Sequence, residues 1–253
     1  MGSVVRKYTL SGIGLQAGIV SLLLLFLLSG CGRAINRTAE RRIREALPDL
    51  LGPASSYHVH VDGAAERTLD GNLAKVTIDG DNIVLSNGLQ LDHLHLELEG
   101  VQIDTDHRKV RAIRRSRFEA KVSADSLDEY LTGESPLGEK IRKPRVTFGT
   151  GNLVTIAAER LTLGVGVPFQ LTGPLHVRDL NGAQGIEMDP NRLEVVGIPL
   201  TGLVLHFMLD RFAGATSLST LPFPVQIREV HTAPGMLTMS GAANVTEILK
   251  KMH

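Results

Sequence analysis

The sequence predicts an α+β fold: a curved, largely antiparallel β-sheet with an N-terminal helix and an apolar C-terminal helix packed on it. Three observations lead to this prediction. Apolar side chains recur at helical spacing over residues 33–51, and apolar and polar side chains alternate from residue 55 onward between Asp-Gly and Asn-Gly turns. An uncharged apolar run then lies between Glu194 and Asp210. Many short strands with few helices are typical of antiparallel α+β folds.

The chain opens with the three parts of a lipoprotein signal sequence. Arg6 and Lys7 form a basic segment, residues 17–28 form an apolar block shorter than a membrane span, and Leu28-Ser29-Gly30-Cys31 follows directly. In this pattern a peptidase cuts before the cysteine, whose sulfur takes up a diacylglyceryl group. The sequence therefore predicts lipidation at Cys31 and attachment to the cell membrane or outer membrane on the extracytoplasmic side.

An uncleaved transmembrane anchor is the alternative, because no charge occurs from Tyr8 through Gly32. Cleavage before Cys31 would leave 25 basic and 27 acidic side chains, a balance that predicts no nucleic-acid partner. The predicted organisation has four parts: a signal peptide (1–30), a lipidated N-terminus with a basic helix (31–52), a β-rich domain (53–245) and a C-terminal tail (246–253).

Residues 33–51 predict an amphipathic helix that Pro48 kinks or ends and that Gly52-Pro53 closes. Its polar faces are rich in arginine, including Arg41 and Arg42. Next to a lipidated cysteine these side chains would lie at the headgroups, where each contributes about 1 kcal/mol toward an anionic surface. An ordinary solvated helix face is the alternative.

Alternation of apolar and polar residues predicts two long strands, and a short helix is expected after the second. Leu94, Leu96 and Leu98 share one face, and the phase then slips at Gly100, which predicts a β-bulge there. A second alternating segment ends at Ser123, which is expected to cap a short helix over residues 125–131.

The clearest alternation covers residues 161–171 and predicts one strand with all its odd-numbered apolar residues on one face. Pro168 places that strand at an edge or a bulge. Residues 223–230 and 236–242 predict a closing hairpin around Pro234-Gly235. Before this hairpin, residues 201–212 predict an apolar helix covered by the sheet, by lipid, or by both.

Few residues suggest chemistry. His58 with His60, and His93 with His95, make a metal site geometrically possible, but they lie on the polar faces of their strands, where solvated histidines are expected. No nucleophile elbow, phosphate-binding loop or zinc-protease motif occurs, and the one cysteine lies at the anchor. The sequence therefore predicts neither an enzyme nor a metal or other cofactor.

Basic residues concentrate between residues 107 and 121, including Arg111, Arg114 and Arg115. Guanidinium groups match phosphate well, so a rim that contacts headgroups or the membrane is one interpretation. A solvated strand edge protected from aggregation is the other.

The order of weak motifs resembles a known family. It comprises Leu94–Val101, with its Leu-x-Leu-x-Leu-x-Gly-Val pattern, the Ser126–Leu131 helix, Leu-Pro-Phe-Pro-Val-Gln-Ile-Arg-Glu-Val over Leu221–Val230, and Gly235–Ala242. Over about residues 35–245 this is similar to the LmeA-like family of bacterial cell-envelope proteins, which bind phospholipid. Family members usually carry an apolar Gly-Phe-Pro-like segment after the first strand, where this chain has Gly63-Ala64-Ala65-Glu66-Arg67.

The resemblance implies a non-catalytic, lipid-binding domain over residues 53–245, whose curved sheet cradles the acyl chains of a phospholipid or glycolipid. An envelope assembly lipoprotein that binds a protein partner through the same surface is the alternative. The residues expected to line the groove are all apolar: Leu94, Leu96, Leu98, Leu163, Val165, Val167, Phe169, Leu203, Phe207, Phe223 and Val225.

Overall fold

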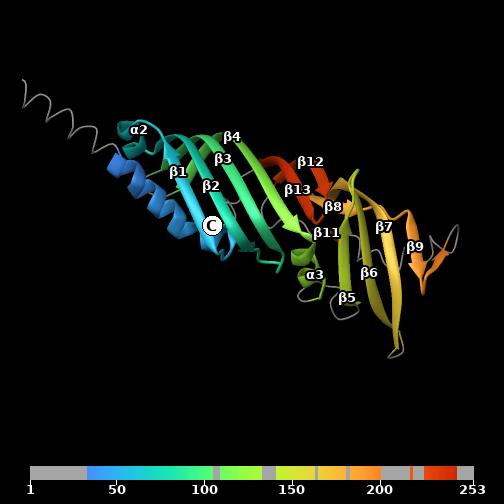
Figure 1. Cartoon of the computed structure of the whole chain (residues 1–253). Coiled ribbons are helices and arrows are strands. Elements are labelled where there is room, and N and C mark those ends of the chain that lie inside the picture. Colours follow the sequence, from blue (N-terminus) through green and yellow to red (C-terminus); the bar gives the residue numbers. More distant parts are fainter. Residues whose placement is uncertain are drawn as a thin grey trace, which may run out of the picture.

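The computed structural model describes residues 33–104, 109–132, 141–162, 165–180, 183–200, 217–218 and 225–243, and its strands form two open sheets. Figure 1 shows an elongated molecule with the first sheet at one end, the second sheet at the other, and α3 (Ala124–Thr132) between them. Every pairing among the described strands is antiparallel. The α+β class is therefore confirmed, whereas the prediction of one continuous sheet is wrong.

The first sheet has six strands in the order β1-β2-β3-β4-β13-β12. Their bounds are β1 Ser56–Asp62, β2 Asn72–Val84, β3 Gln90–Asp104, β4 Lys109–Ser123, β12 Val225–Ala233 and β13 Met236–Ala243. A short helix, α2 (Ala65–Leu69), connects β1 to β2. The predicted closing hairpin is thus confirmed, with Gly235 at φ 78° in its turn, and β13 pairs with β4.

The second sheet has seven strands. Their bounds are β5 Ile141–Phe148, β6 Leu153–Thr162, β7 Val165–Leu180, β8 Ala183–Met188, β9 Arg192–Val195, β10 Ile198–Leu200 and β11 Ser217–Leu218. Five of them follow the order β10-β9-β7-β6-β5, while β8 pairs with the second half of β7 and with β11. The predicted apolar helix at 201–212 lies outside the described residues.

The N-terminal helix covers residues 33–51 and protects the open edge of β1. Glu40 accepts hydrogen bonds from the backbone amide of Val61 (3.0 Å) and contacts the His60 ring (3.1 Å). Asn36 donates to the Gly63 carbonyl at the start of the α2 connection. Because an unpaired edge amide invites aggregation, the Glu40 contact fixes the helix where the sheet needs a cover.

This helix continues through Pro48 and ends at Leu51, before Gly52 at φ 119°. Its predicted end at Gly52-Pro53 is confirmed, since the Gly52 amide bonds to the Pro48 carbonyl (3.0 Å). The Tyr57 hydroxyl donates to the Gly52 carbonyl (2.8 Å), and burial raises the pKa of Tyr57 to about 12.

The phase slip predicted at Gly100 is present, but its cause differs from the prediction. Gly100 adopts φ 62°, and neither the β2–β3 nor the β3–β4 register shifts there. Leu98 and Val101, which stand on either side of the slip, are both buried. The register shift of a bulge lies instead between Gln102 and Ile103. The Asp79-Gly80 turn signal is also wrong, because Gly80 lies inside β2, where a Cβ would come within 2.8 Å of the Tyr57 ring.

The single strand predicted over residues 161–171 is wrong, because β6 ends at Thr162 and β7 begins at Val165. Thr162 pairs with Val165 and Leu161 with Gly166, so the segment is the end of a hairpin. Directly paired residues share a face in an antiparallel sheet. Leu161 therefore lies on the opposite face from Phe169 and Leu171, which are buried with their partners Ala158 and Ile156.

The predicted cap of α3 is confirmed. The Ser123 hydroxyl accepts the backbone amide of Ser126 (3.1 Å), and Asp92 of β3 accepts both the amide (2.6 Å) and the hydroxyl (2.9 Å) of Ser123. The carboxylate thus fixes the point at which the chain leaves the first sheet for the second.

We expect Gly52→Ala to destabilise the fold by at least about 2–3 kcal/mol, because the new Cβ would lie 2.0 Å from the Val84 carbonyl oxygen. Gly151→Ala is the control, since Gly151 also has a positive φ (71°) but has no atom within 4 Å of an added Cβ. It should cost only about 1 kcal/mol of backbone strain. Urea unfolding measures both, and equal losses would contradict the clash.

Candidate functional site

The inner face of the first sheet is an apolar surface that crosses all of its strands. One row of paired residues runs Val59, Ile78, Leu96, Phe118, Gly241 and Ile227. The neighbouring rows add Leu94 with Ala120 and Met239, and Val76 with Leu98. Aliphatic side chains dominate this face, because period-two alternation in long strands places every second residue there.

The predicted lining residues divide into three groups. Five are buried, with exposed fractions of 8% or less: Leu94, Leu96, Leu98, Phe169 and Val225. Val167 is half-buried, whereas Val165 is 64% exposed and does not line the inner face, because it begins β7 beyond the end of β9. Leu163, Leu203, Phe207 and Phe223 lie outside the described residues.

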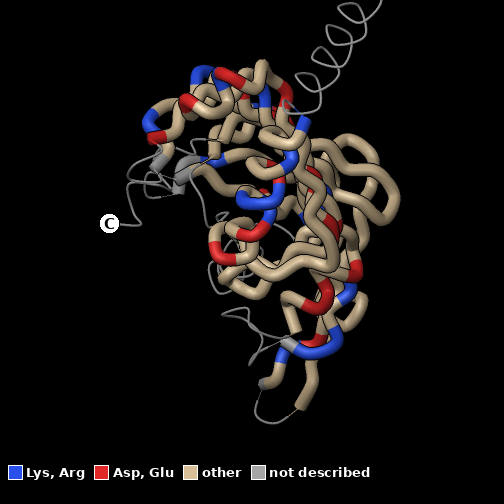
Figure 2. The backbone as a smooth tube through the Cα atoms, turned by 90° about the vertical axis from the view of Figure 1, so that its left-hand side faces the viewer, with Lys and Arg blue, Asp and Glu red and all other residues tan. Residues whose placement is uncertain are grey.

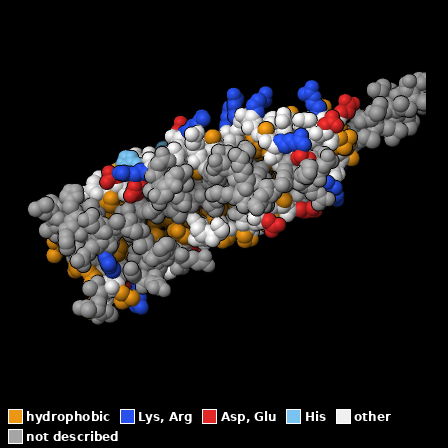
Figure 3. Space-filling model, turned by 180° about the vertical axis from the view of Figure 1, so that it is seen from behind, with side chains coloured by type: hydrophobic (Ala, Val, Ile, Leu, Met, Phe, Trp, Pro, Cys, Tyr) orange, Lys and Arg blue, Asp and Glu red, His pale blue; other side chains and the backbone are white. Residues whose placement is uncertain are grey.

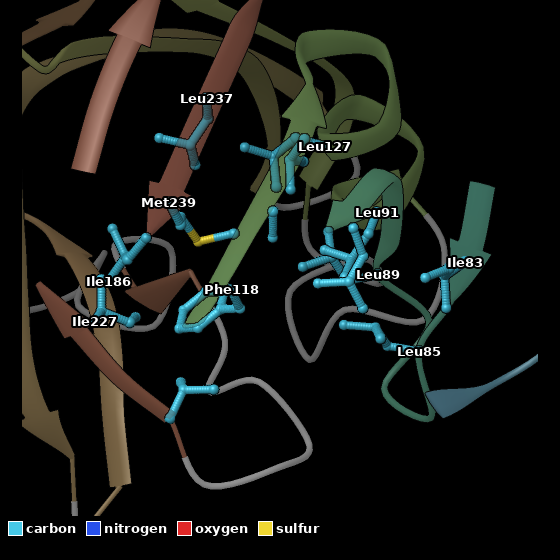
Figure 4. Packing of buried hydrophobic residues seen from close by; sticks show 14 of the residues in the cluster. Ile83, Leu85, Leu89, Leu91, Phe118, Leu127, Ile186, Ile227, Leu237 and Met239 are labelled. Carbon is cyan, nitrogen blue, oxygen red and sulfur yellow. The ribbon is translucent and has the colours of Figure 1, made fainter. Parts of the chain in front are cut away.

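The second sheet contributes an inner face that the sequence reasoning missed. Its buried side chains are Val146, Phe148, Val154, Ile156, Leu171, Leu175, Ile186, Met188 and Leu193. Figure 4 shows Ile186 of β8 close to Ile227 of β12, with Met239 and Phe118 farther along the same apolar cluster. The alternation of Val154, Ile156 and Ala158 was visible in the sequence and marked this face.

Three hydrogen bonds join the sheets beside this apolar face. The backbone amide of Ile227 donates to Gln184 Oε1 (2.8 Å), and that of Thr232 to Asn152 Oδ1 (3.2 Å). The Thr232 hydroxyl donates to the Gly149 carbonyl. These contacts form the seam (Gln184, Ile227, Thr232, Gly149 and Asn152), the line along which the edge strand β12 meets the second sheet.

Buried polar side chains are few. In the described residues they are Thr68, Ser126, Asp128 and Thr232. Thr68 belongs to α2, Ser126 and Asp128 to α3, and Thr232 to the seam. No buried side-chain nitrogen or oxygen in this part of the chain lacks a partner. The inner face is therefore mainly aliphatic, and the hydroxyls of Ser116 and Thr232 on it already donate to backbone carbonyls.

The outer face of the first sheet carries a ladder of paired polar side chains. His93 contacts Asp81 (2.9 Å), His95 contacts Asp79 (2.6 Å), and Lys75 contacts Glu97 (2.7 Å). The hydrogen bond from His93, followed by that from Ser56, lowers the pKa of Asp81, and the Lys75 hydrogen bond lowers that of Glu97. Among the described residues no group of three His, Cys, Asp or Glu side chains suits a metal ion.

The predicted headgroup residues are exposed but partly engaged. Arg111 donates to Asp104 (2.6 Å), and Arg114 and Arg115 lie 3.9 Å and 3.8 Å from Glu99. Figure 3 shows Lys and Arg side chains projecting from a long edge of the molecule, whereas Figure 2 shows acids interspersed among them. Arg41 and Arg42 lie on the exposed side of the N-terminal helix, with Arg41 4.0 Å from Glu45.

A hollow of about 420 Å³ lies where α3 meets β5. It is lined by Asp128, Glu129, Thr132, Lys143, Pro144 and Arg145. Asp128 already accepts the backbone amide of Val146 (2.6 Å) and bonds to Arg145 (3.3 Å). Its carboxylate is therefore part of the α3–β5 connection.

Comparison with known proteins places the chain in a family. The family model described as LmeA-like phospholipid-binding matches residues 30–242. The chain belongs to the LmeA-like phospholipid-binding family. No curated protein and no solved structure matches it. Because the match spans both sheets and the returning hairpin, the whole described fold is that of an LmeA-like domain.

Two further features of this LmeA-like chain concern the connection after β1 and the length of its helices. Residues 63 and 64 connect β1 to α2, which begins at Ala65 and whose Leu69 is 62% exposed. Within the described part of the chain no helix combines the length and hydrophobicity needed to cross a membrane.

Acidification tests the outer-face ladder. Because the pKa of folded Asp81 lies below its ordinary value of 3.8, this pair stabilises the fold above about pH 4, and the contribution disappears as the pH falls through the folded pKa. The free energy of unfolding should therefore fall more steeply from about pH 5 to about pH 3 in the natural protein than in Asp81→Asn. The difference should stay below about 1 kcal/mol, because both side chains are partly exposed.

Asp70→Asn, in the exposed turn between α2 and β2, serves as the control and should follow the natural protein. Parallel curves for Asp81→Asn and the natural protein would show that the His93 contact does not lower the pKa of Asp81.

Proposed function

We propose that this protein is a membrane-anchored, non-catalytic lipoprotein of the cell envelope that binds phospholipid between its two sheets. The observation that carries the proposal is the apolar inner face, which two open sheets share. The match to a phospholipid-binding family supports the same ligand class. The headgroup would remain at the surface, because the described inner face is mainly aliphatic and the hydroxyls of Ser116 and Thr232 on it are already bonded to backbone carbonyls.

Separating the sheets at the seam costs little free energy from lost hydrogen bonds and much more from lost aliphatic contacts. The seam holds three hydrogen bonds, from Ile227 and Thr232, whose groups return to water when the sheets separate. The aliphatic contacts across it would be replaced by an acyl chain, which regains about 0.8 kcal/mol for each buried methylene. Leucine, isoleucine and methionine side chains are chemically close to such a chain, so the exchange leaves no buried polar group unpaired.

The N-terminal end supports membrane attachment. Cys31 precedes the described helix by two residues, so a lipid on its sulfur would lie beside the start of that helix. Asn36 bonds to Thr68, which brings α2 and its exposed Leu69 to the same end. An apolar side chain and the helix arginines beside an acylated cysteine are the contacts that an interfacial anchor needs.

We expect Leu96→Asn to reduce co-purifying phospholipid roughly tenfold, because an unpaired amide against an acyl chain costs about 1–3 kcal/mol. Native mass spectrometry of the purified protein measures bound lipid. His95→Asn, the adjacent outward-facing position on β3, is the matched control and should retain lipid.

A circular-dichroism melt accompanies each variant, since Leu96 is only 8% exposed. Should Leu96→Asn unfold, Leu96→Met, with similar volume and no polar group, must keep both fold and lipid. A natural protein that stays folded after delipidation and takes up no fluorescent phospholipid would refute the proposed function.

Lipidation is tested separately at Cys31. Cys31→Ser should leave an unprocessed precursor that takes up no palmitate analogue, because only a thiol accepts the lipid there. Metabolic labelling and electrophoretic mobility measure the two effects. Identical labelling of the natural protein and the variant would exclude anchoring through Cys31 and leave the uncleaved anchor as the alternative.

A further inference from the structure

The second sheet ends in two adjacent hairpins that expose aliphatic side chains. Six large hydrophobic residues are exposed in the described part of the chain, and three of the four most exposed lie here: Val165, Val196 and Ile198, each 64% exposed. The backbone amide of Val196 donates to the Pro168 carbonyl (3.0 Å), which joins the β9–β10 turn to the β6–β7 hairpin. We call Val165, Pro168, Val196 and Ile198 the apolar tip.

The β9–β10 turn holds its exposed valine in a strained backbone conformation. Ile198 pairs with Val195, so the loop has two residues, Val196 at φ 55° and Gly197 at φ 75°. A two-residue hairpin with both φ angles positive favours Asn-Gly, and a β-branched side chain in this region is a true outlier. The other described non-glycine residues with positive φ are Asn82, Lys143 and Asn152, none of them β-branched.

A turn that is strained, apolar and exposed is destabilising for an isolated domain, which points to a function for the valine. The charge around it indicates the partner. From the tip to the row of Thr172 and Arg192, the described strands of this end carry five bases, Arg142, Lys143, Arg145, Arg160 and Arg192, and two acids, Glu159 and Glu194. Both acids are already paired, Glu159 with Lys143 (2.9 Å) and Glu194 with Arg192 (2.8 Å). The surplus of positive charge behind an apolar tip fits an anionic lipid surface.

The position of the tip indicates which lipid surface it meets. Figure 1 shows the N-terminal helix at one end of the elongated molecule and β9 at the other, and Figure 3 shows hydrophobic side chains at the far end of the second sheet. We propose that the apolar tip inserts into a second lipid surface, facing the one that holds the N-terminus. This contact does not require a lipid bound between the sheets.

The test uses the full chain reconstituted into vesicles, where its N-terminal segment holds it. The chain contains no tryptophan, so Ile198→Trp places a single indole at the tip. Acceptor vesicles of phosphatidylcholine and phosphatidylglycerol with brominated acyl chains are then added, because bromine quenches an indole that enters the acyl region. Leu153→Trp, at the end of β6 opposite to the β6–β7 turn, is the matched control.

We expect acceptor vesicles to quench the Ile198→Trp protein and not the Leu153→Trp protein. Adding Val196→Asn to Ile198→Trp should raise the Tm by about 2–4 °C, because asparagine relieves the turn strain. The same change should raise the acceptor concentration needed for half-maximal quenching roughly tenfold, because one inserted valine is lost. Gain of stability with loss of contact cannot result from unfolding.

Absence of quenching by acceptor vesicles in the Ile198→Trp protein overturns the proposal. Tip-dependent association of two copies without acceptor vesicles also overturns it and identifies a second copy as the occupant. Native mass spectrometry of the same Ile198→Trp protein measures phospholipid bound between the sheets independently of quenching, so a failure of lipid binding between the sheets is distinguishable from a failure of the tip.

Discussion

The fold depends on the return of the C-terminal hairpin to β4. Ser116 of β4 donates to the carbonyl of Ala243, 127 residues later, and β13 pairs with β4 from Ser123 to Phe118. This places β12 at the edge of the first sheet, where it reaches Gln184 and Asn152 of the second. Neither sheet alone covers its own inner face, so a pairing of such large sequence separation has to form before the two halves share a core.

The separation of chemistry between the two faces explains why such a core suits lipid. On β3, Leu94, Leu96 and Leu98 lie on the inner face. His95 and Glu97 lie between them on the outer face, where they are paired with Asp79 and Lys75. The ionic contacts therefore hold the register without placing a charge in the core. Since register shifts by one residue would exchange the faces, the outer ladder protects the apolar one.

The sequence patterns predicted those features of the fold that interactions between neighbouring residues determine. The helix over residues 33–51, the Ser123 cap, the Pro234-Gly235 hairpin and the inward row of β3 each follow from periodicity or turn chemistry. The division into two sheets did not, because strand order depends on contacts between distant segments. The hairpin at β6–β7 was missed for a specific reason: apolar residues keep their period of two from Leu161 to Leu171, although direct pairing across the turn moves Leu161 to the outer face.

Turn residues show where local preference and final structure disagree. Gly88, Asn152 with Gly151, and Gly235 adopt positive φ angles that their residue types readily accept, so these turns stabilise the strands that they join. Val196 adopts the same positive φ region, which valine disfavours, in the two-residue loop that follows the end of β9 at Val195. Strand pairing between β9 and β10 spans only three residues on each side, which is little to offset strain. A valine that is 64% exposed in that position gains little packing from the chain around it, and the proposed contact of the tip with a lipid surface would supply the free energy that offsets the strain.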